Sequence, residues 1–207
     1  MTNAKVSVVI PSYNSGGTIE EAIESVLAQD VPVEIIVIDD CSLDDTEHVL
    51  QKYKNDPRIR IIVNEKNLGV AASRNRGVKE AVCDRVAFLD SDDMWVDGKL
   101  VKQLKLMDET GTLICADRNI MMKYPMGNDD IHEDYICWLQ ILKECGQAVL
   151  INEPLLLYRV VKNSKSGSKL SSAKKTFAVY RKLGYGFFRS CLYFANYAVN
   201  GVKKYFL

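Results

Sequence analysis

The stretch that decides the fold is residues 85–93, which read Arg-Val-Ala-Phe-Leu-Asp-Ser-Asp-Asp. Its first half is a short apolar run, which is typical of a buried strand. Its second half places three carboxylates within four residues, directly where the apolar run stops. We therefore expect a strand that carries an acidic loop at its carboxyl end.

Three similar strands precede this one, and helical patterns separate them. The strands are expected at 6–10, where Pro11 stops the run, and at 34–38 and 58–63. Helices are expected to begin at a capping-box pattern, Thr18 with Glu21, and to cover 42–54, 70–82 and 98–109. Alternating strands and helices predict an α/β fold, a Rossmann-like and mostly parallel sheet with helices on both faces.

The loops at the carboxyl ends of parallel strands share one edge of the sheet, where ligands bind in such folds. This singles out the loops at 11–14, 39–42 and 90–93. Later in the chain we expect a short strand at 113–116, a helix at 135–142 and two strands at 149–151 and 155–161.

Composition describes a chain of 207 residues, enough for one domain with an appendage. Its six cysteines form no CxxC pair and only two histidines accompany them, so we expect free thiols and no zinc site. The N-terminus opens into a strand-like run, and no apolar stretch reaches about 18 residues. These features predict a cytoplasmic protein without a leader or a membrane span.

The acidic loop has two interpretations. Clustered carboxylates repel one another, and Mg²⁺ or Mn²⁺ relieves that repulsion while binding phosphate oxygens as well. The same residues could instead form a solvated turn that caps the next helix.

Other candidates have equally plain structural alternatives. Asp39 and Asp40 could accept hydrogen bonds from a nucleoside, or only shape a turn. Tyr13 could stack on a base, Arg74 could face a diphosphate or pair with a surface carboxylate, and Asp134 could act as a general base or start a helix. Dinucleotide, P-loop and GxSxG motifs are absent.

Five motifs in order resemble the family 2 glycosyltransferases of the GT-A fold, over about residues 4–161. They are the segments 6–14, 36–46, 67–77, 88–93 and 133–139. The resemblance implies an inverting glycosyltransferase that moves a sugar from a nucleotide-diphosphate sugar, UDP-sugar above all, to a hydroxyl acceptor in cell-surface glycan synthesis.

The resemblance also assigns roles to individual residues. Asp134 would be the catalytic base, Asp92 would hold Mg²⁺ or Mn²⁺, and Asp90 would approach the ribose. The nucleotide-sugar site would comprise Pro11, Tyr13, Asp39, Asp40, Arg74 and Asp90.

One departure from the family is the segment 94–132, which is shorter than in similar members. Either the acceptor site is rebuilt economically, or the chain is an impaired relative that binds nucleotide sugar without transferring it. A nucleotidyltransferase is a third interpretation, and the missing Gly/Arg-rich phosphate loop argues against it.

The charge is distributed unevenly, which divides the chain into residues 1–161, the GT-A domain, and residues 162–207, a helical tail. From Arg159 onward there are 11 basic and no acidic residues, and ten of the 18 aromatic residues follow position 176. Such a tail could lie on an anionic membrane surface, peripheral to the inner face of the plasma membrane, or pack on the domain or in a homodimer. The expected partners are the donor and a glycan or lipid-linked acceptor, with no nucleic acid.

Overall fold

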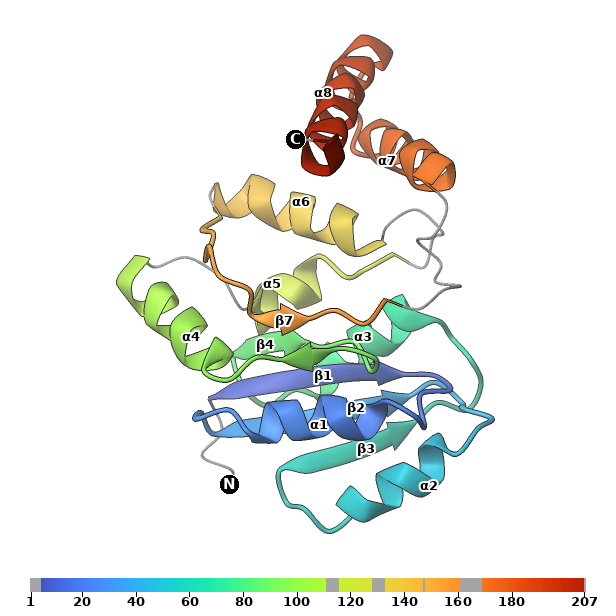
Figure 1. Ribbon diagram of the computed structural model, residues 1–207, viewed down its shortest axis with the longest axis vertical. Coiled ribbons are helices and arrows are strands. Elements are labelled where there is room, and N and C mark those ends of the chain that lie inside the picture. The colour runs from blue at the N-terminus through green and yellow to red at the C-terminus, as the bar shows by residue number, and fades with distance from the viewer. Residues whose placement is uncertain (1–4, 111–115, 128–132, 147, 161–168, 207) are drawn as a thin grey trace.

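The computed structural model describes residues 5–110, 116–127, 133–146, 148–160 and 169–206. A five-stranded sheet in the order β3-β2-β1-β4-β6 forms its centre (Figure 1). Strands β1 (Val6–Ser12), β2 (Val33–Asp39), β3 (Ile59–Val63) and β4 (Arg85–Phe88) run parallel, and β6 (Ala116–Asp117) pairs antiparallel with β4. The predicted mixed α/β architecture with a mainly parallel sheet is confirmed.

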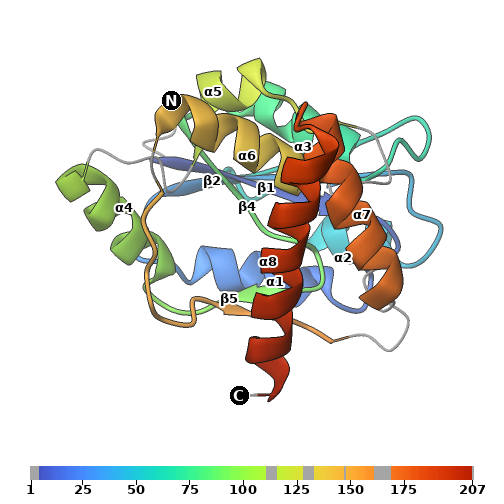
Figure 2. The same cartoon turned by 90° about the horizontal axis from the view of Figure 1, so that it is seen from above.

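Helices cover both faces of this sheet, with α1 and α2 on one side and α3, α5 and α6 on the other (Figure 2). A short pair of strands, β5 and β7, lies beside the sheet and joins the acidic loop to the later part of the chain. The bounds are α1 Ile19–Leu27, α2 Thr46–Leu50, the 3-10 helix η1 Gln51–Tyr53, α3 Val70–Glu80, β5 Met94–Trp95, α4 Lys99–Thr110, α5 Arg118–Lys123, α6 Glu133–Cys145, β7 Leu156–Leu157, α7 Lys169–Lys182 and α8 Phe187–Phe206.

The core divides by the two-residue period of the strands. On β1, Val8 and Ile10 pack with α1 and α4, whereas Val9 between them packs with α3, α5 and α6. Continuous apolar strands are therefore buried on both faces, as expected for parallel sheets. Gly77 lets α3 approach the sheet closely, because a Cβ there would lie 2.2 Å from Val9 Cγ1.

Pro11 does not end β1, contrary to expectation. The strand continues to Ser12 and stays paired with β2, but its pairing with β4 ends at Val9 and Phe88. Proline has no amide hydrogen, so it can remain in a strand only where one ladder stops. The carboxyl ends of β1 and β4 are free to separate from this point.

Three local predictions are wrong. Thr18 makes no capping hydrogen bond, and Glu21 pairs with Arg159 instead of closing a capping box. The helix expected from residue 42 begins at Thr46, because the preceding residues form a turn. No strand forms at 149–151, and only Leu156–Leu157 is a strand within 155–160. Of the expected strand at 113–116, residues 113–115 lie outside the described residues.

The C-terminal helices α7 and α8 lie against each other at the end of the molecule opposite β3 and α2 (Figure 1). Aromatic contacts join them, since Phe177 meets Phe194 edge to face with ring centroids 5.8 Å apart. Within the described residues, no helix has both the length and the apolar character needed to cross a bilayer.

Candidate active site

The loops after β1 and β2 are joined by hydrogen bonds at the carboxyl edge of the sheet. Asn14 takes a left-handed conformation with φ 51°, its amide donates to Ser42 Oγ at 2.9 Å, and its side chain accepts from Leu43. The Ser15 amide donates to Thr46 Oγ1 at 2.8 Å. These contacts explain why α2 starts late, and they leave Tyr13 projecting, with 46% of its surface exposed. Pro11 is buried beneath them.

Asp40 is buried and organises the next loop. Its Oδ1 accepts from Asn64 Nδ2 at 2.6 Å and from the Leu68 amide at 2.9 Å, and its Oδ2 accepts from the Gly69 amide at 2.7 Å. Both oxygens are therefore used within the protein. In this structure Asp40 holds the loop in front of α3, and its predicted contact with the nucleotide stays a prediction.

Asp39 occupies a different surrounding from Asp40. Its Oδ1 accepts from the Ser42 amide and hydroxyl. Its side chain also lines a pocket of about 180 Å³ between α2 and β3, together with Lys54 and Val63. Asp39 is thus the member of the acidic pair that borders open space.

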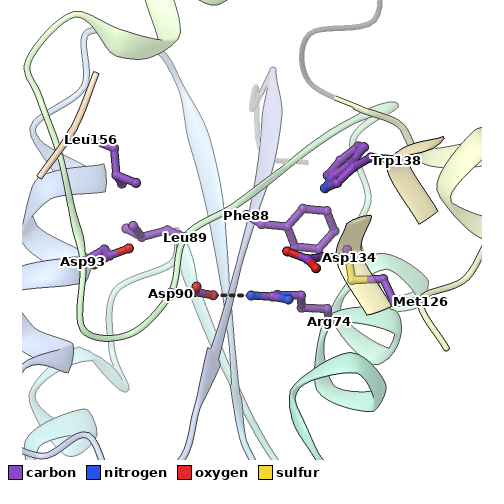
Figure 3. Close-up of a pocket in the computed structure, with 9 residues that line it drawn as sticks. All are labelled: Arg74, Phe88, Leu89, Asp90, Asp93, Met126, Asp134, Trp138 and Leu156. Atoms are coloured by element: carbon purple, nitrogen blue, oxygen red, sulfur yellow. Dashed lines mark hydrogen bonds and ion pairs between the residues drawn. The ribbon is translucent and has the colours of Figure 1, made fainter. Parts of the chain in front are cut away.

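A second pocket, of about 140 Å³, lies beyond the end of β4 (Figure 3). It brings together side chains from α3, the acidic loop and α6, which are far apart in the sequence. Figure 3 shows Arg74 and Asp134 on the same side, with Asp90 across from them. The lining residues are Arg74, Phe88, Leu89, Asp90, Asp93, Met126, Asp134, Trp138 and Leu156.

Arg74 and Asp90 form an ion pair across this pocket, with Nη2 and Oδ1 2.5 Å apart. The Arg74 side chain is only 12% exposed, whereas that of Asp90 is 45% exposed. The buried Nε of Arg74 has no hydrogen-bond partner among the described residues. A cation with an unused donor therefore borders the pocket, and an incoming anion could accept from it.

Arg159 fixes the acidic loop from the other side. Its amide donates to Asp93 Oδ1 at 2.9 Å, and its Nε donates to the Asp92 carbonyl at 3.0 Å. Burial, with the charges of Asp92 and Asp90 adding to it, raises the pKa of Asp93 above its ordinary value. In the described part of the chain the Asp92 carboxylate makes no hydrogen bond, so it is the carboxylate of the loop that remains available.

Asp134 lies in the first turn of α6, and its Oδ1 accepts from the next amide, that of Tyr135, at 2.7 Å. One turn later Trp138, 40% exposed, meets Phe88 edge to face with ring centroids 6.3 Å apart. The two rings give the pocket an apolar wall beside its acids. An apolar wall with a few polar groups is typical of a ligand site.

Sequence reasoning identified the acids but missed their surroundings. Arg74, Asp90 and Asp134 do meet in one pocket, while Tyr13 and Asp39 lie farther along the same edge. Asp93 and Trp138 stand inside quoted motifs, and their motif positions were the available signal. Leu156 stands in the strand expected at 155–161. Met126 and the hydrogen bonds of Arg159 had no such signal, because they depend on segments that return to the site from distant parts of the chain.

The described residues contain no group of three or more His, Cys, Asp or Glu side chains placed to hold a metal ion. A single carboxylate such as Asp92 is still compatible with a hard cation. Mg²⁺ is commonly held by one or two carboxylates and completed by substrate phosphates and water.

Comparison with known proteins identifies the family. Residues 7–182 match Glycosyl transferase family 2. The chain belongs to glycosyl transferase family 2. It is therefore an enzyme of the transferase class, and the sequence resemblance is confirmed.

Two relatives cover nearly the whole chain. The putative teichuronic acid biosynthesis glycosyltransferase TuaG of Bacillus subtilis is 38% identical over 250 positions, covering 99% of each protein. WfgD of Escherichia coli, named a UDP-Glc:α-D-GlcNAc-diphosphoundecaprenol β-1,3-glucosyltransferase, is 29% identical, covering 99% of this chain and 96% of WfgD.

The alignment with TuaG is longer than this chain. With 250 aligned positions and 207 residues, at least 43 positions (250 − 207) have no residue here. That the missing residues fall between 94 and 132 stays a prediction.

Solved structures confirm the GT-A fold. The Pyrobaculum calidifontis mannosyltransferase PcManGT, in complex with GDP-Man and Mn²⁺, superposes with a TM-score of 0.76 at 17% identity, over 90% of this chain and 68% of that one. S. aureus TarS 1–349 with UDP-GlcNAc gives 0.70 at 20% identity, over 84% of this chain and 65% of that one. At such identities the likeness concerns the fold.

Proposed function

We propose that this chain transfers a sugar from a nucleotide-diphosphate sugar to a hydroxyl group of a cell-surface glycan precursor, with inversion at the anomeric carbon. The observation that carries the proposal is the pocket in which Arg74, Asp90 and Asp134 meet. A cation for the diphosphate, a carboxylate for the ribose and a carboxylate for the acceptor proton are the groups that such a transfer needs.

The donor would extend along the edge of the sheet. The pocket of about 140 Å³ is smaller than the roughly 300–1,000 Å³ of whole-ligand sites, so it fits the sugar and its phosphates rather than a complete nucleotide. The nucleotide base would lie toward Tyr13 and Asp39, and the pocket that Asp39 lines has a volume of about 180 Å³. Pro11 and Asp40 would act from beneath by shaping the two loops.

UDP is the nucleotide that the relatives favour. WfgD is named for UDP-Glc and TarS was solved with UDP-GlcNAc, while PcManGT carries GDP-Man. The base edge distinguishes these nucleotides through its hydrogen bonds, and Asp39 is the buried acceptor nearest to open space. A carboxylate at that position pairs with the N–H of uracil or guanine.

Asp92 would hold Mg²⁺ or Mn²⁺ together with the donor's two phosphates, which fits a loop that offers one available carboxylate. When bound, the cation neutralises charge on the departing diphosphate. Arg159 keeps the Asp92 backbone in place, and Arg74 supplies a further positive charge from α3. If a donor phosphate replaced Asp90 as the partner of Arg74, Arg74 would bind the donor without a change in the fold.

Asp134 would accept the proton of the acceptor hydroxyl. As that oxygen bonds to the anomeric carbon, the bond from this carbon to the diphosphate breaks and the nucleoside diphosphate leaves with the electron pair. One in-line displacement inverts the centre. Trp138 and Phe88 would exclude water beside the reacting atoms, and the exposed indole face offers a surface for the acceptor sugar.

The acceptor follows the chemistry named for WfgD, a sugar linked through diphosphate to a polyprenol. The protein would then work at a membrane surface on a lipid-borne substrate. The helical pair α7–α8 stands apart from the sheet (Figure 1), and the division into 1–161 and 162–207 stays a prediction.

The test uses the purified full chain, UDP-sugars, Mn²⁺ and a synthetic GlcNAc-diphosphate-polyprenol acceptor, with products identified by mass spectrometry. We expect Asp134→Asn to lower transfer by about 10²- to 10⁴-fold while donor binding is retained. Asp108→Asn, on the exposed side of α4, is the matched control. Full activity of Asp134→Asn would show that Asp134 is not the catalytic base. Donor binding without transfer to any hydroxyl acceptor would refute the transfer reaction.

A further inference from the structure

Helix α8 has two apolar faces, and only one of them is covered by the described residues. The covered face packs on α7, where Phe194 meets Phe177 and Tyr193 meets Tyr180 with centroids 5.7 Å apart. Ser190 on this face is fully buried. Figure 2 shows α7 and α8 close together near the turn that joins them, with the C-terminal half of α8 extending away from α7.

The other face carries large apolar side chains in solvent. Phe188 is 88% exposed, Leu192 70% and Val199 54%. Leu192 and Val199 follow Phe188 by four and eleven residues, which places the three side chains within about 40° of one another at 100° per residue. The covered residues Ser190 and Phe194 lie on the opposite side. We call these three exposed side chains the ridge, and we expect it to contact a partner, because exposed apolar patches mark interaction surfaces.

Charge decides what kind of occupant fits. No Asp or Glu follows Glu153, and eleven Lys and Arg residues do. Among the described ones, Lys174, Arg181 and Arg189 are exposed. A symmetric contact between two copies of this face would bring like charges together. An anionic bilayer attracts each Lys or Arg by about 1 kcal/mol near its surface.

We propose that the α7–α8 pair docks on an anionic lipid bilayer, with Phe188, Leu192 and Val199 inserted at the headgroup boundary. The flanking Lys and Arg side chains contact the lipid phosphates. No described helix is able to span a bilayer, so the pair lies on the surface in the manner of interfacial amphipathic helices. The observation underneath is a helix with an apolar face on each side, in a part of the sequence that contains no Asp or Glu.

The docked helices also contact the candidate active site. Tyr180 of α7 is 9% exposed and hydrogen-bonds Tyr135 of α6, the residue directly after Asp134. Burial, with the neighbouring Tyr135 adding to it, raises the pKa of Tyr180 to about 12. Docking would hold α6, and with it the candidate base, near the bilayer. This last step rests on the proposed function, whereas docking itself does not.

The experiment measures cosedimentation of the full chain with phosphatidylcholine vesicles that contain or lack phosphatidylglycerol. We expect binding to the anionic vesicles only, weakened by added salt because the Debye length shortens. Phe188→Gln with Leu192→Gln should lower the partition coefficient at least about tenfold, since each side chain gains about 1.5–3 kcal/mol on full burial. Leu150→Gln, at an equally exposed leucine, is the matched control.

Equal partitioning of the wild type and the double variant would overturn the proposal, provided that their thermal midpoints agree. Light scattering tests the alternative partner, a second copy of this chain. If the wild type is a dimer and the double variant is a monomer, the ridge is a dimer interface and the docking proposal is overturned. Donor binding measured without vesicles separates the two proposals. The double variant should retain it, and a wild-type chain that sediments with the anionic vesicles but binds no donor would count against the sugar transfer alone.

Discussion

Replacement of Arg74 by methionine separates a structural role of this residue from a role in donor binding. Methionine keeps the aliphatic length of a side chain that is only 12% exposed, so the packing of α3 on the pocket is largely preserved. The change removes the guanidinium that faces Asp90 and the Nε that has no partner among the described residues.

The two roles predict different magnitudes. Asp90 is 45% exposed, so solvent screens the ion pair and its loss costs at most about 1 kcal/mol of folding free energy. For a domain of this size that is roughly 2–4 °C in Tm. A charge-assisted hydrogen bond to a donor phosphate contributes about 1.5–3 kcal/mol, so donor affinity should fall roughly 10- to 150-fold.

Isothermal titration of UDP-sugar in the presence of Mn²⁺ measures the affinity, and differential scanning fluorimetry measures Tm. Arg85→Met is the matched control, since Arg85 pairs with Asp108 at 2.9 Å at the amino end of the strand that leads to Asp90. An unchanged donor affinity in Arg74→Met, or an equal loss in Arg85→Met, would refute the assignment of Arg74 to the diphosphate.

Three further predictions concern stability and the acceptor. Burial raises the pKa of Asp93, so its charge destabilises the fold at neutral pH. We therefore expect Asp93→Asn to raise Tm at pH 7. This gain in Tm should vanish as the pH falls to 3.8, the ordinary pKa of an aspartate. Constant Tm differences across this range would contradict it. Gly77→Ala should destabilise by about 1–3 kcal/mol in urea unfolding, because its Cβ would overlap Val9, whereas Gly17→Ala, with open space around it, should not. Trp138→Leu should raise the acceptor KM about tenfold and leave donor affinity unchanged, and a change confined to the donor would be contrary.

Much of the fold could be predicted because its central strands are strong local signals. The runs around Val8 and Ile36 are apolar on both faces, and only a strand between two helical layers buries them. The acidic loop after Leu89 could also be predicted from the sequence. Three carboxylates directly after an apolar run indicate a buried strand and the edge of the sheet at which its loop lies. The family resemblance then joined Asp134 to this edge.

The remaining features depend on contacts that local sequence does not encode. The pair β5–β7 has two residues in each strand, too few for a period, and forms because Met94 lies opposite Leu157. Glu21 fits a capping box locally, but an ion pair with Arg159 takes its carboxylate. Pro11 reads as a strand end until the limited pairing with β4 is known. In each case a distant segment outweighed the local preference.

The bond from the Arg159 amide to Asp93 spans 66 residues of chain, and it affects when the site is completed during synthesis. A ribosome adds roughly 5–20 residues per second, so about 3–13 s pass between the two positions. In that interval the Rossmann-like half can fold around its own strands, while its acidic loop still lacks the hydrogen bond from Arg159. The nascent protein would thus acquire a stable core before it acquires tight affinity for its donor.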